Sequence, residues 1–447
     1  MKSLPDKDKI IKAVKEAGVV GAGGAGFPAY VKYNAKVDFV IVNAAECEPL
    51  LRVDQQLVAR EPEKLLRGLE FACIATGASK GIIGIKAKYK KAISSLEKVL
   101  TSTGFSLPIN IHLLKNYYPA GDEHLMVYDV TGRVVPEGGI PLEVGVVVNN
   151  VNTLLNVADA MKGHPVIDRP LTITGEVVKP VTVTLPVGTS IREAIEIAGG
   201  STVKDFVVVA GGPMMGKLVE DLEGPVTKTT SGLIVLPSTH KLALIMGQRQ
   251  KTAMRLAAEV CCSCRICTDL CPRHMLGHAL KPHKVMKAVY LGLPLVDHTQ
   301  AFLCVECSVC EIACFMGLSP KRVFMDLKTD LFRKGIKNPH RRRDISPYFL
   351  REERKIPVKR ILSQLNLSYL EDPAPFLDMV YSPSRVTIPL KQHIGSPSVP
   401  VVKVNDTVKR GTLLGAIPEG AIGAGVHASI SGIVTEINNN SIIIEER

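Results

Sequence analysis

The chain has 447 residues, of which 46% are hydrophobic and 22% charged. A single hydrophobic core stops growing well below this length, so we expect roughly three or four domains. No apolar run approaches the roughly 20 residues of a membrane-spanning helix, and the first residues lack the apolar stretch of a secretory signal. We therefore expect a cytoplasmic protein without a transmembrane segment.

The net charge of +12 comes from basic residues that are scattered along the chain, apart from short runs at 86–91 and 341–343. Proteins that bind nucleic acids usually combine basic residues with stacking aromatic side chains, and aromatic residues make up only 5% of this chain. We expect no nucleic-acid partner. The charge is typical of a solvated basic face or a docking surface for acidic partners.

Residues 1–165 alternate between helical and strand patterns, which predicts an α/β domain. The run at 37–43 is continuously apolar, as a buried parallel strand requires. The other elements expected here are helices at 8–17, 61–75 and 90–100 and a strand at 81–86.

Residues 166–240 predict a small α+β unit of the β-grasp type. Strict alternation at 171–175 and 181–185 indicates two half-buried strands. Ser190 and Glu193 form a capping box that starts a short helix, and a further strand is expected at 206–210.

The last two hundred residues divide into three parts. Residues 241–335 hold most of the cysteines and begin with an expected helix at 252–260. Residues 336–383 are charged and rich in proline, which predicts a connector with short helices. Residues 384–447 predict short strands only, with a hairpin turn at 438–440.

Nine of the 11 cysteines fall between residues 261 and 314, whereas a disulfide framework would spread its pairs through the chain. Two runs share the spacing Cys-x2-Cys-x2-Cys-x3-Cys, the first followed by Pro272. In such runs three cysteines hold one [4Fe–4S] cluster and the fourth holds the other. The predicted ligand sets are Cys261, Cys264, Cys267 and Cys314 for one cluster, and Cys304, Cys307, Cys310 and Cys271 for the second.

Zinc is the alternative metal for Cys-x2-Cys pairs, but two tandem runs of this kind are hard to reconcile with tetrahedral zinc. Cys262 lies outside the spacing, as a neutral neighbour or a replacement ligand. We expect Cys47 to flank a site and Cys73 to lie in a core. The histidines after the first run are expected to be solvated, with approach to an electron acceptor as the alternative: His274, His278 and His283.

A glycine-rich turn at 21–28 contains the spacing Gly-x-Gly-x-x-Gly, which alone is weak support for nucleotide binding. It follows a helix instead of a strand, so a dinucleotide-binding fold is not indicated. The turn still offers backbone amides without Cβ atoms that can approach a phosphate or a flat ring. On these residues alone, a purely structural turn is an equal alternative.

Four segments together resemble the NADH-binding flavoprotein subunit of respiratory complex I. They are Gly21-Ala-Gly-Gly-Ala-Gly-Phe-Pro28 with Lys32, Asn43-Ala-Ala-Glu46-Cys-Glu48-Pro49, Tyr118-Pro-Ala-Gly121-Asp122-Glu123, and Asn149-Asn150-Val-Asn-Thr153-Leu154. The resemblance implies an FMN site to which NADH delivers electrons.

The same resemblance implies individual roles. Glu46 and Glu123 would be the catalytic pair beside the isoalloxazine ring and the nicotinamide. The implied cofactor-binding residues are Gly21, Gly23, Gly24, Ala25, Gly26, Phe27, Lys32, Asn43, Glu48, Gly121, Asp122, Asn149, Asn150 and Thr153. The sequence departs from the family at Ala35, Ala45 and Asp122, which bears on the affinity for NADH and on the choice between NADH and NADPH.

The order of parts resembles two further families. A flavin domain, a β-grasp domain and a double ferredoxin also occur in the C subunit of the Rnf electron-transport complex, where a lipoyl-like segment comes first. Here that segment comes last, as in the PduS-type cobalamin reductases of propanediol-utilisation microcompartments. The resemblance implies a multidomain α/β and α+β protein with an FMN domain, a β-grasp domain, a two-cluster ferredoxin-like domain and a C-terminal lipoyl-like barrel-sandwich.

The implied activity is NADH-dependent transfer of electrons through FMN and two [4Fe–4S] clusters to cobalamin, which reactivates the cofactor of a diol dehydratase. Implied partners are a corrinoid-dependent enzyme or adenosyltransferase and a shell protein, with a place inside a bacterial microcompartment. Two alternatives stay open: an electron-transfer subunit that docks on another complex, and a corrinoid-binding redox sensor. The lipoyl-like tip at 428–432 lacks a lysine, so we expect a structural domain there.

Overall fold

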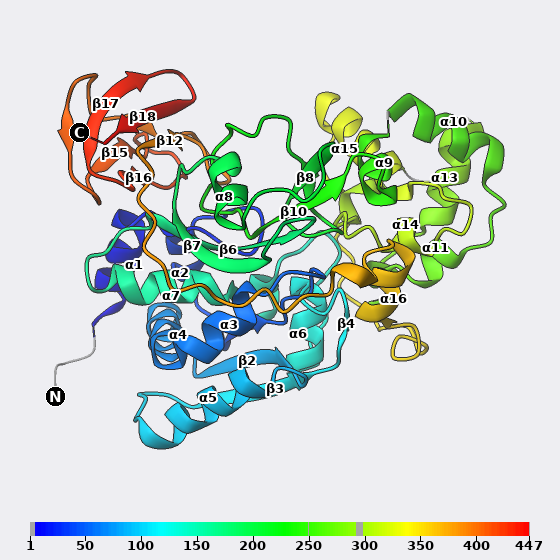
Figure 1. Ribbon diagram of the computed structural model, residues 1–447. Helices are drawn as coiled ribbons and strands as arrows, with labels where there is room; N and C mark the ends of the chain where they lie inside the picture. The colour runs from blue at the N-terminus through cyan, green and yellow to red at the C-terminus, as the bar shows by residue number, and fades with distance from the viewer. Residues whose placement is uncertain (1–4, 249, 292–297, 447) are drawn as a thin grey trace.

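The computed structural model describes residues 5–248, 250–291 and 298–446. An α/β domain lies at the bottom of the view in Figure 1, with a β-grasp domain above it. A helical domain that carries the cysteine runs lies on one side of the β-grasp domain, and a barrel-sandwich of short strands lies on the other. The predicted multidomain fold class is confirmed.

The α/β domain is built on a parallel sheet of order β3-β2-β1-β5. Its central strands are apolar and buried, as expected for a parallel sheet covered on both faces. The strands are β1 (Phe39–Ala44), β2 (Lys80–Lys86), β3 (Ile109–Leu114) and β5 (Val146–Asn150). The helices are α1 (Lys7–Glu16), α2 (Ala29–Tyr33), α3 (Val53–Arg60), α4 (Pro62–Thr76), α5 (Lys90–Ser102), α6 (Glu123–Thr131) and α7 (Val151–Ala160), with the 3-10 turn η1 (Pro141–Val144).

The three helices and two strands predicted for this domain are confirmed within a few residues at each end. The strands β3 and β5 and the helices α2, α3, α6 and α7 were not predicted. The helices α6 and α7 begin directly at polar segments that were assigned to a cofactor site. Asp122 and Asn150 cap them by accepting hydrogen bonds from backbone N–H groups.

The β-grasp domain is a mixed sheet of order β7-β6-β10-β8-β9 packed on one helix, α8 (Ile191–Ile197). The capping box of Ser190 and Glu193 is present, as predicted. The strands are β6 (Asp168–Gly175), β7 (Val181–Pro186), β8 (Phe206–Ala210), β9 (Lys217–Leu218) and β10 (Gly232–Pro237). The central strand β10 was not predicted, although it is a continuous apolar run.

The cysteine runs lie on loops and on the short helices that follow them, with Cys267 in α11 and Cys310 in α14. The helices are α9 (Lys241–Gly247), α10 (Gln250–Val260), α11 (Ile266–Asp269), α12 (Pro272–Met275), α13 (Pro282–Leu291), α14 (Val309–Ala313) and α15 (Pro320–Arg333), with the 3-10 turn η2 (His298–Leu303). The expected helix at 252–260 corresponds to α10 and is confirmed. Below, the part from α10 to α15 is called the cluster domain.

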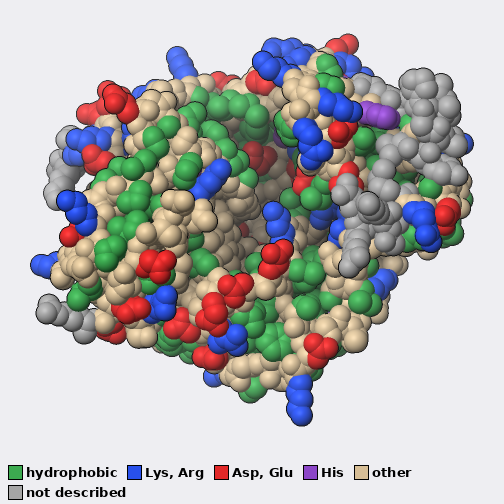
Figure 2. Space-filling model, turned by 90° about the horizontal axis from the view of Figure 1, so that it is seen from above, with side chains coloured by type: hydrophobic (Ala, Val, Ile, Leu, Met, Phe, Trp, Pro, Cys, Tyr) green, Lys and Arg blue, Asp and Glu red, His purple; other side chains and the backbone are tan. Residues whose placement is uncertain are grey.

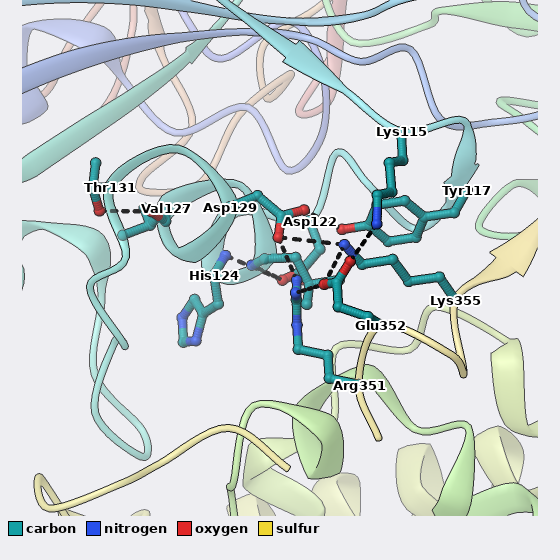
Figure 3. Close-up of polar contacts among 11 residues, drawn as sticks. Lys115, Tyr117, Asp122, His124, Val127, Asp129, Thr131, Arg351, Glu352 and Lys355 are labelled. Carbon is teal, nitrogen blue, oxygen red and sulfur yellow. Dashed lines mark hydrogen bonds and ion pairs between the residues drawn. The ribbon is translucent and has the colours of Figure 1, made fainter. Parts of the chain in front are cut away.

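The connector that follows is anchored on the α/β domain. Its strand β11 (Ile356–Pro357) pairs with β4 (Tyr117–Tyr118), and α16 (Val358–Gln364) and η3 (Ser368–Leu370) follow. Figure 3 shows Arg351, Glu352 and Lys355 of the connector facing Asp129 of α6 and Lys115. Arg351 and Asp129 are buried and 2.6 Å apart, so this network fixes the connector beside β4.

The C-terminal domain consists of two small sheets, of order β12-β18-β17-β14 and β13-β15-β16. The strands are β12 (Arg385–Pro389), β13 (Val399–Pro400), β14 (Thr407–Val408), β15 (Leu413–Ala416), β16 (Val426–His427), β17 (Gly432–Ile437) and β18 (Ser441–Glu445). The hairpin turn predicted at 438–440 joins β17 to β18. The tip is not presented to solvent: Ser429 is fully buried and donates a hydrogen bond to the carbonyl of Val187 in the β-grasp domain.

The surface carries mixed charge on the face seen from above, where Lys and Arg side chains are interspersed with Asp and Glu around a central hollow (Figure 2). Within the described part of the chain, no helix combines the length and the apolar character that crossing a bilayer requires. Cys73 is fully buried in the core of the α/β domain, as predicted.

Candidate functional site

The glycine-rich turn between α1 and α2 forms a closed loop. Gly21 N–H donates to the carbonyl of Phe27 at 2.9 Å, and Gly26 has a left-handed φ of 71°. Residues 23–25 are exposed, and a Cβ added at Gly24 would meet no atom within 4 Å. At Gly23 an added Cβ would press on the side chain of Asn150. The loop therefore presents bare backbone next to the amide groups at the end of β5.

Buried polar groups with unused hydrogen-bonding capacity surround this loop. Thr153 Oγ1 accepts from Ala22 N–H at 2.9 Å, and Asn149 accepts from Tyr33 OH at 3.4 Å. Among the described residues, Asn149 Nδ2 and Arg169 Nη1 have no hydrogen-bond partner although both side chains are buried. Buried donors without partners are rare in folded proteins, and a bound ligand or an ordered water usually satisfies them. The residues present fit a phosphate-bearing cofactor such as FMN.

Lys32 and Glu123 face each other across the sheet end, 3.3 Å apart, and Lys32 Nζ also donates to the carbonyl of Val148. Asn43 Nδ2 donates to the carbonyl of Gly121 at 2.8 Å. Segments that are far apart in the sequence thus meet at the carboxyl end of the parallel sheet. In open α/β sheets this edge is where ligands bind.

Two carboxylates, Glu46 and Asp54, lie together beneath the loop. Glu46 accepts from Asp54 N–H at 2.7 Å and from Gln55 Nε2 at 2.8 Å, and Asp54 accepts from Asn150 Nδ2 at 2.7 Å. Burial raises the pKa of Glu46, and burial together with the neighbouring Glu46 raises the pKa of Asp54 to about 7. A proton can therefore be held at this pair near neutral pH.

Glu48 and Asp122 point away from the loop. Glu48 accepts from Met214 N–H of the β-grasp domain at 2.9 Å, and burial raises its pKa to about 7. Asp122 caps α6 and forms a buried ion pair with Arg273 of the cluster domain at 3.0 Å. The structure thus places these two predicted cofactor residues at contacts between domains, and their role in cofactor binding stays a prediction.

The cysteines of the two runs surround two separate cavities. One is lined by Cys261, Cys264, Cys267 and Cys314, and the other by Cys271, Cys304, Cys307 and Cys310. The runs therefore exchange their fourth cysteines in space, as the ferredoxin spacing requires. Cys262 also lines the first cavity. This position fits both of its expected roles, as a neutral neighbour and as a replacement ligand.

The chemistry of these cavities fits iron–sulfur clusters. Among the described residues, no three Cys, His, Asp or Glu side chains converge on a point that could hold a single metal ion. The thiols are instead spread around each cavity, as four irons with one cysteine each require. Burial raises the pKa of Cys267 and of Cys271 to about 12, so cluster binding has to displace their protons.

The histidines after the first run are not solvated as expected. His278 is buried and shares a hydrogen bond with the carbonyl of Val135, and burial lowers its pKa to about 4. His283 bonds to Thr268 at 2.7 Å, and His274 packs near the ring of Tyr348. The prediction was wrong for His278, because the cluster domain packs this residue against the α/β domain, whereas His274 and His283 are half-buried. These contacts give each of the three histidine rings a structural role in packing.

Several residues at the site were not predicted. Arg169 donates to the carbonyl of Ala22 in the glycine loop, and Tyr118 OH donates to the carbonyl of Cys307 at 2.9 Å. Arg169 had a detectable signal, because it lies on the same face of an alternating strand as the buried Leu171 and Ile173. Asp54 and Arg273 gave no comparable signal, since their partners are distant in the sequence.

Four families match consecutive parts of the chain. The Nuo51 FMN-binding domain matches residues 14–159, the SLBB domain 170–218, the 4Fe-4S dicluster domain 260–319 and the RnfC barrel sandwich hybrid domain 376–446. The chain therefore contains an FMN-binding domain and a domain for two [4Fe–4S] clusters, in the order expected from the sequence.

Curated relatives and solved structures agree with this order. A solved structure of an NAD+-reducing [NiFe]-hydrogenase in the H2-reduced state matches with a TM-score of 0.50 and 23% identity, over 82% of this chain and 68% of that chain, which supports the fold. The C subunit of the Na(+)-translocating ferredoxin:NAD(+) oxidoreductase complex of Acetobacterium woodii is 36% identical over 60% of this chain and 59% of its own length. Cobalamin reductase PduS of Citrobacter freundii is 46% identical over 99% of this chain and 97% of its own length. The chain belongs to the PduS cobalamin reductase family.

Proposed function

We propose that this chain is an NADH-dependent cobalamin reductase. In the overall reaction one NADH becomes NAD+ and a proton, and its two electrons reduce two Co(III) corrinoids to Co(II). Bound FMN supplies the chemistry that accepts a hydride and releases single electrons. The clusters carry these electrons away from the flavin domain. The name of the full-length relative and the FMN and dicluster domains support the proposal.

One structural observation carries it: a cysteine cavity adjoins the flavin site. Tyr118 and Asp122 lie in the segment that resembles the flavin-lining motif of complex I. Tyr118 donates to the carbonyl of Cys307, and Asp122 pairs with Arg273, two residues after Cys271. Both cysteines line the same cavity. We infer that the cluster in this cavity receives electrons first.

We assign the following tasks to the residues of the flavin site. The amides of the glycine loop, Lys32 and the amide side chains at the end of β5 hold the phosphate and ribityl chain. Glu46 and Glu123 line the place where the nicotinamide meets the flavin, and Glu46 shares a proton with Asp54. Tyr33 orients Asn149 through its hydroxyl group.

The proposed partners follow from the same resemblance. The reduced corrinoid would pass to an adenosyltransferase or directly to a corrinoid-dependent diol dehydratase. We place the protein in a bacterial microcompartment, docked on a shell protein. Co-purification of the chain with shell proteins from the native host would test this placement.

An anaerobic titration tests the proposed function. The holoprotein receives NADH while flavin and cluster absorbance are followed, with and without hydroxocobalamin. We expect rapid bleaching and, with the corrinoid present, formation of the Co(II) spectrum together with reoxidation of the clusters. Bleaching without corrinoid reduction would contradict the assigned acceptor and leave the flavoprotein in place.

The similarity to the ferredoxin:NAD(+) oxidoreductase subunit supports a second candidate. In this case the chain would dock on a partner protein and deliver electrons to it instead of to a free corrinoid. Bleaching by NADH followed by reoxidation with a ferredoxin, but not with hydroxocobalamin, would favour this candidate.

A further inference from the structure

A cavity of about 390 Å³ lies where three parts of the chain meet. One wall is the loop 213–218 of the β-grasp domain, a second is helix α9 and a third is formed by the segment 306–326 of the cluster domain. The volume falls in the range of ligand pockets, which often lie between domains. The cavity is separate from the glycine loop and from the two cysteine cavities.

This cavity adjoins both sets of cluster cysteines. Cys314, which also lines the cavity of the first set, forms part of its wall. Glu306 and Ser308, which flank Cys307, line both this cavity and the cavity of the second set. A molecule bound here would lie next to the cysteines of both sets.

The walls are largely apolar, with four methionines: Met214, Met215, Met246 and Met325. Met215 is 52% exposed and Met325 is 37% exposed, so both lie where the cavity meets solvent. Methionine side chains are flexible and polarizable, and they adapt to irregular apolar shapes. Such a wall suits a bulky ligand whose edge carries methyl groups.

Hydrogen bonds hold the polar part of the cavity in place. Lys321 Nζ donates to Ser308 Oγ at 2.8 Å and to the carbonyl of Met214 at 3.3 Å. Arg322 donates to the carbonyls at the end of α9, including that of Ile245 at 3.0 Å. The two cations join the β-grasp domain and α9 to the cluster domain, so the cavity is formed before a ligand binds. The lining as a whole carries four basic side chains against three acidic ones, so a small excess of positive charge remains.

We propose that this cavity binds one edge of the corrinoid that accepts the electrons, an assignment that rests on the proposed function. A corrinoid is a large ring whose rim alternates methyl groups with amide arms, one of which leads to a phosphodiester. The methionine wall matches the methyl groups, and Lys321 and Arg322 match the amide oxygens and the phosphodiester. The whole molecule exceeds the cavity, and the rest of it lies outside at the exposed methionines.

The test compares hydroxocobalamin binding to the oxidised holoprotein and to two variants, by isothermal titration calorimetry. Met325→Trp and Met215→Trp each fill part of the mouth, and we expect each to weaken binding at least about tenfold. Leu244→Trp is the control, because Leu244 is 62% exposed on helix α9, which forms one wall, and does not itself line the cavity. Flavin content and cluster absorbance report that each variant is folded and loaded.

The outcomes separate the two proposals. Weaker binding in both methionine variants, with unchanged binding in the control, supports the proposal that the corrinoid binds in this cavity. If binding is unchanged in both variants while the wild-type protein still reduces the corrinoid, the proposal that the corrinoid binds in this cavity is contradicted. The proposed function then still holds. A wild-type protein that neither binds nor reduces hydroxocobalamin overturns both.

Discussion

The α/β domain meets the cluster domain and the barrel-sandwich in chemically different ways. Toward the cluster domain it uses paired charge: Asp122 and Arg273 are 3.0 Å apart, with side chains only 11% and 6% exposed. At the junction with the barrel-sandwich, a lysine of the β-grasp domain bridges the two domains through hydrogen bonds. Lys228 is buried and donates to the carbonyls of Gly18 and Gly425, at 2.8 and 2.9 Å.

The difference concerns how strictly each geometry is specified. A buried ion pair gains its Coulomb energy only at close range and good alignment, so it penalises any displacement of the cluster domain. In the proposed route electrons cross from the flavin domain to the cluster domain at this junction, so its geometry sets the distance between the two sites. A lysine that donates to carbonyl oxygens tolerates more variation, and burial lowers its pKa to about 7, so it holds the third domain partly as a neutral amine. The ion pair therefore fixes the position of the cluster domain, whereas Lys228 mainly holds the barrel-sandwich in contact with the rest of the chain.

The largest effect is expected at the ion pair. Arg273→Met leaves Asp122 buried without its cation, which should destabilise the fold by about 3–5 kcal/mol and slow flavin-to-cluster electron transfer. Thermal unfolding and stopped-flow absorbance after mixing with NADH measure the two effects. Arg343→Met is the control, because Arg343 forms an exposed pair with Glu143 worth about 0–1 kcal/mol. Equal effects of both variants would contradict the assigned role.

An intermediate effect is expected at Lys228 and depends on pH. In the unfolded chain this lysine keeps its proton up to a pKa near 10.5, whereas in the fold it loses it near 7. The unfolded state therefore binds more protons between these values, and stability contributed by Lys228 rises with pH in that window. Relative to wild type, Lys228→Met should be more stable at pH 7 than at pH 10 by about 1–3 kcal/mol.

Differential scanning calorimetry at several pH values measures this dependence. The exposed Lys179→Met is the control and should show a pH-independent offset. A parallel offset for Lys228→Met would mean that the lysine stays charged in the fold, and the contrast between the two junctions would disappear.

The smallest effect is expected at Tyr118. Tyr118→Phe removes the hydrogen bond to the carbonyl of Cys307 and should cost about 1 kcal/mol. It should also shift the midpoint potential of one cluster only, which electron paramagnetic resonance during a redox titration resolves. Tyr30→Phe is the control, because its ring keeps the contact with Lys15. Equal shifts of both clusters would show that the contact is not specific to the cavity of Cys307.

Much of this protein could be predicted from local pattern. The ferredoxin spacing placed six of the cluster cysteines on two short loops, because a loop that holds three thiolates around one cluster needs a fixed number of residues. The continuous apolar run before Asn43 and the alternation around Thr172 predicted β1 and β6, since burial on both faces or on one face determines such patterns. The glycine loop was predicted from its run of glycines, because only glycine, which has no Cβ atom, leaves the backbone amides open to a ligand.

What the sequence did not reveal are contacts between side chains that are far apart along the chain. Asp54 and Arg273 have no local pattern that predicts their contacts, because the partner of Asp54 is Asn150 on a distant segment of the same domain and the partner of Arg273 is Asp122 of another domain. The cavity lined by the four methionines has the same origin, with walls from the β-grasp domain, α9 and the cluster domain. By itself the sequence determined which cofactors the chain can hold, and tertiary packing decided which residues of the flavin domain and the cluster domain meet, since distance in space is set by packing alone.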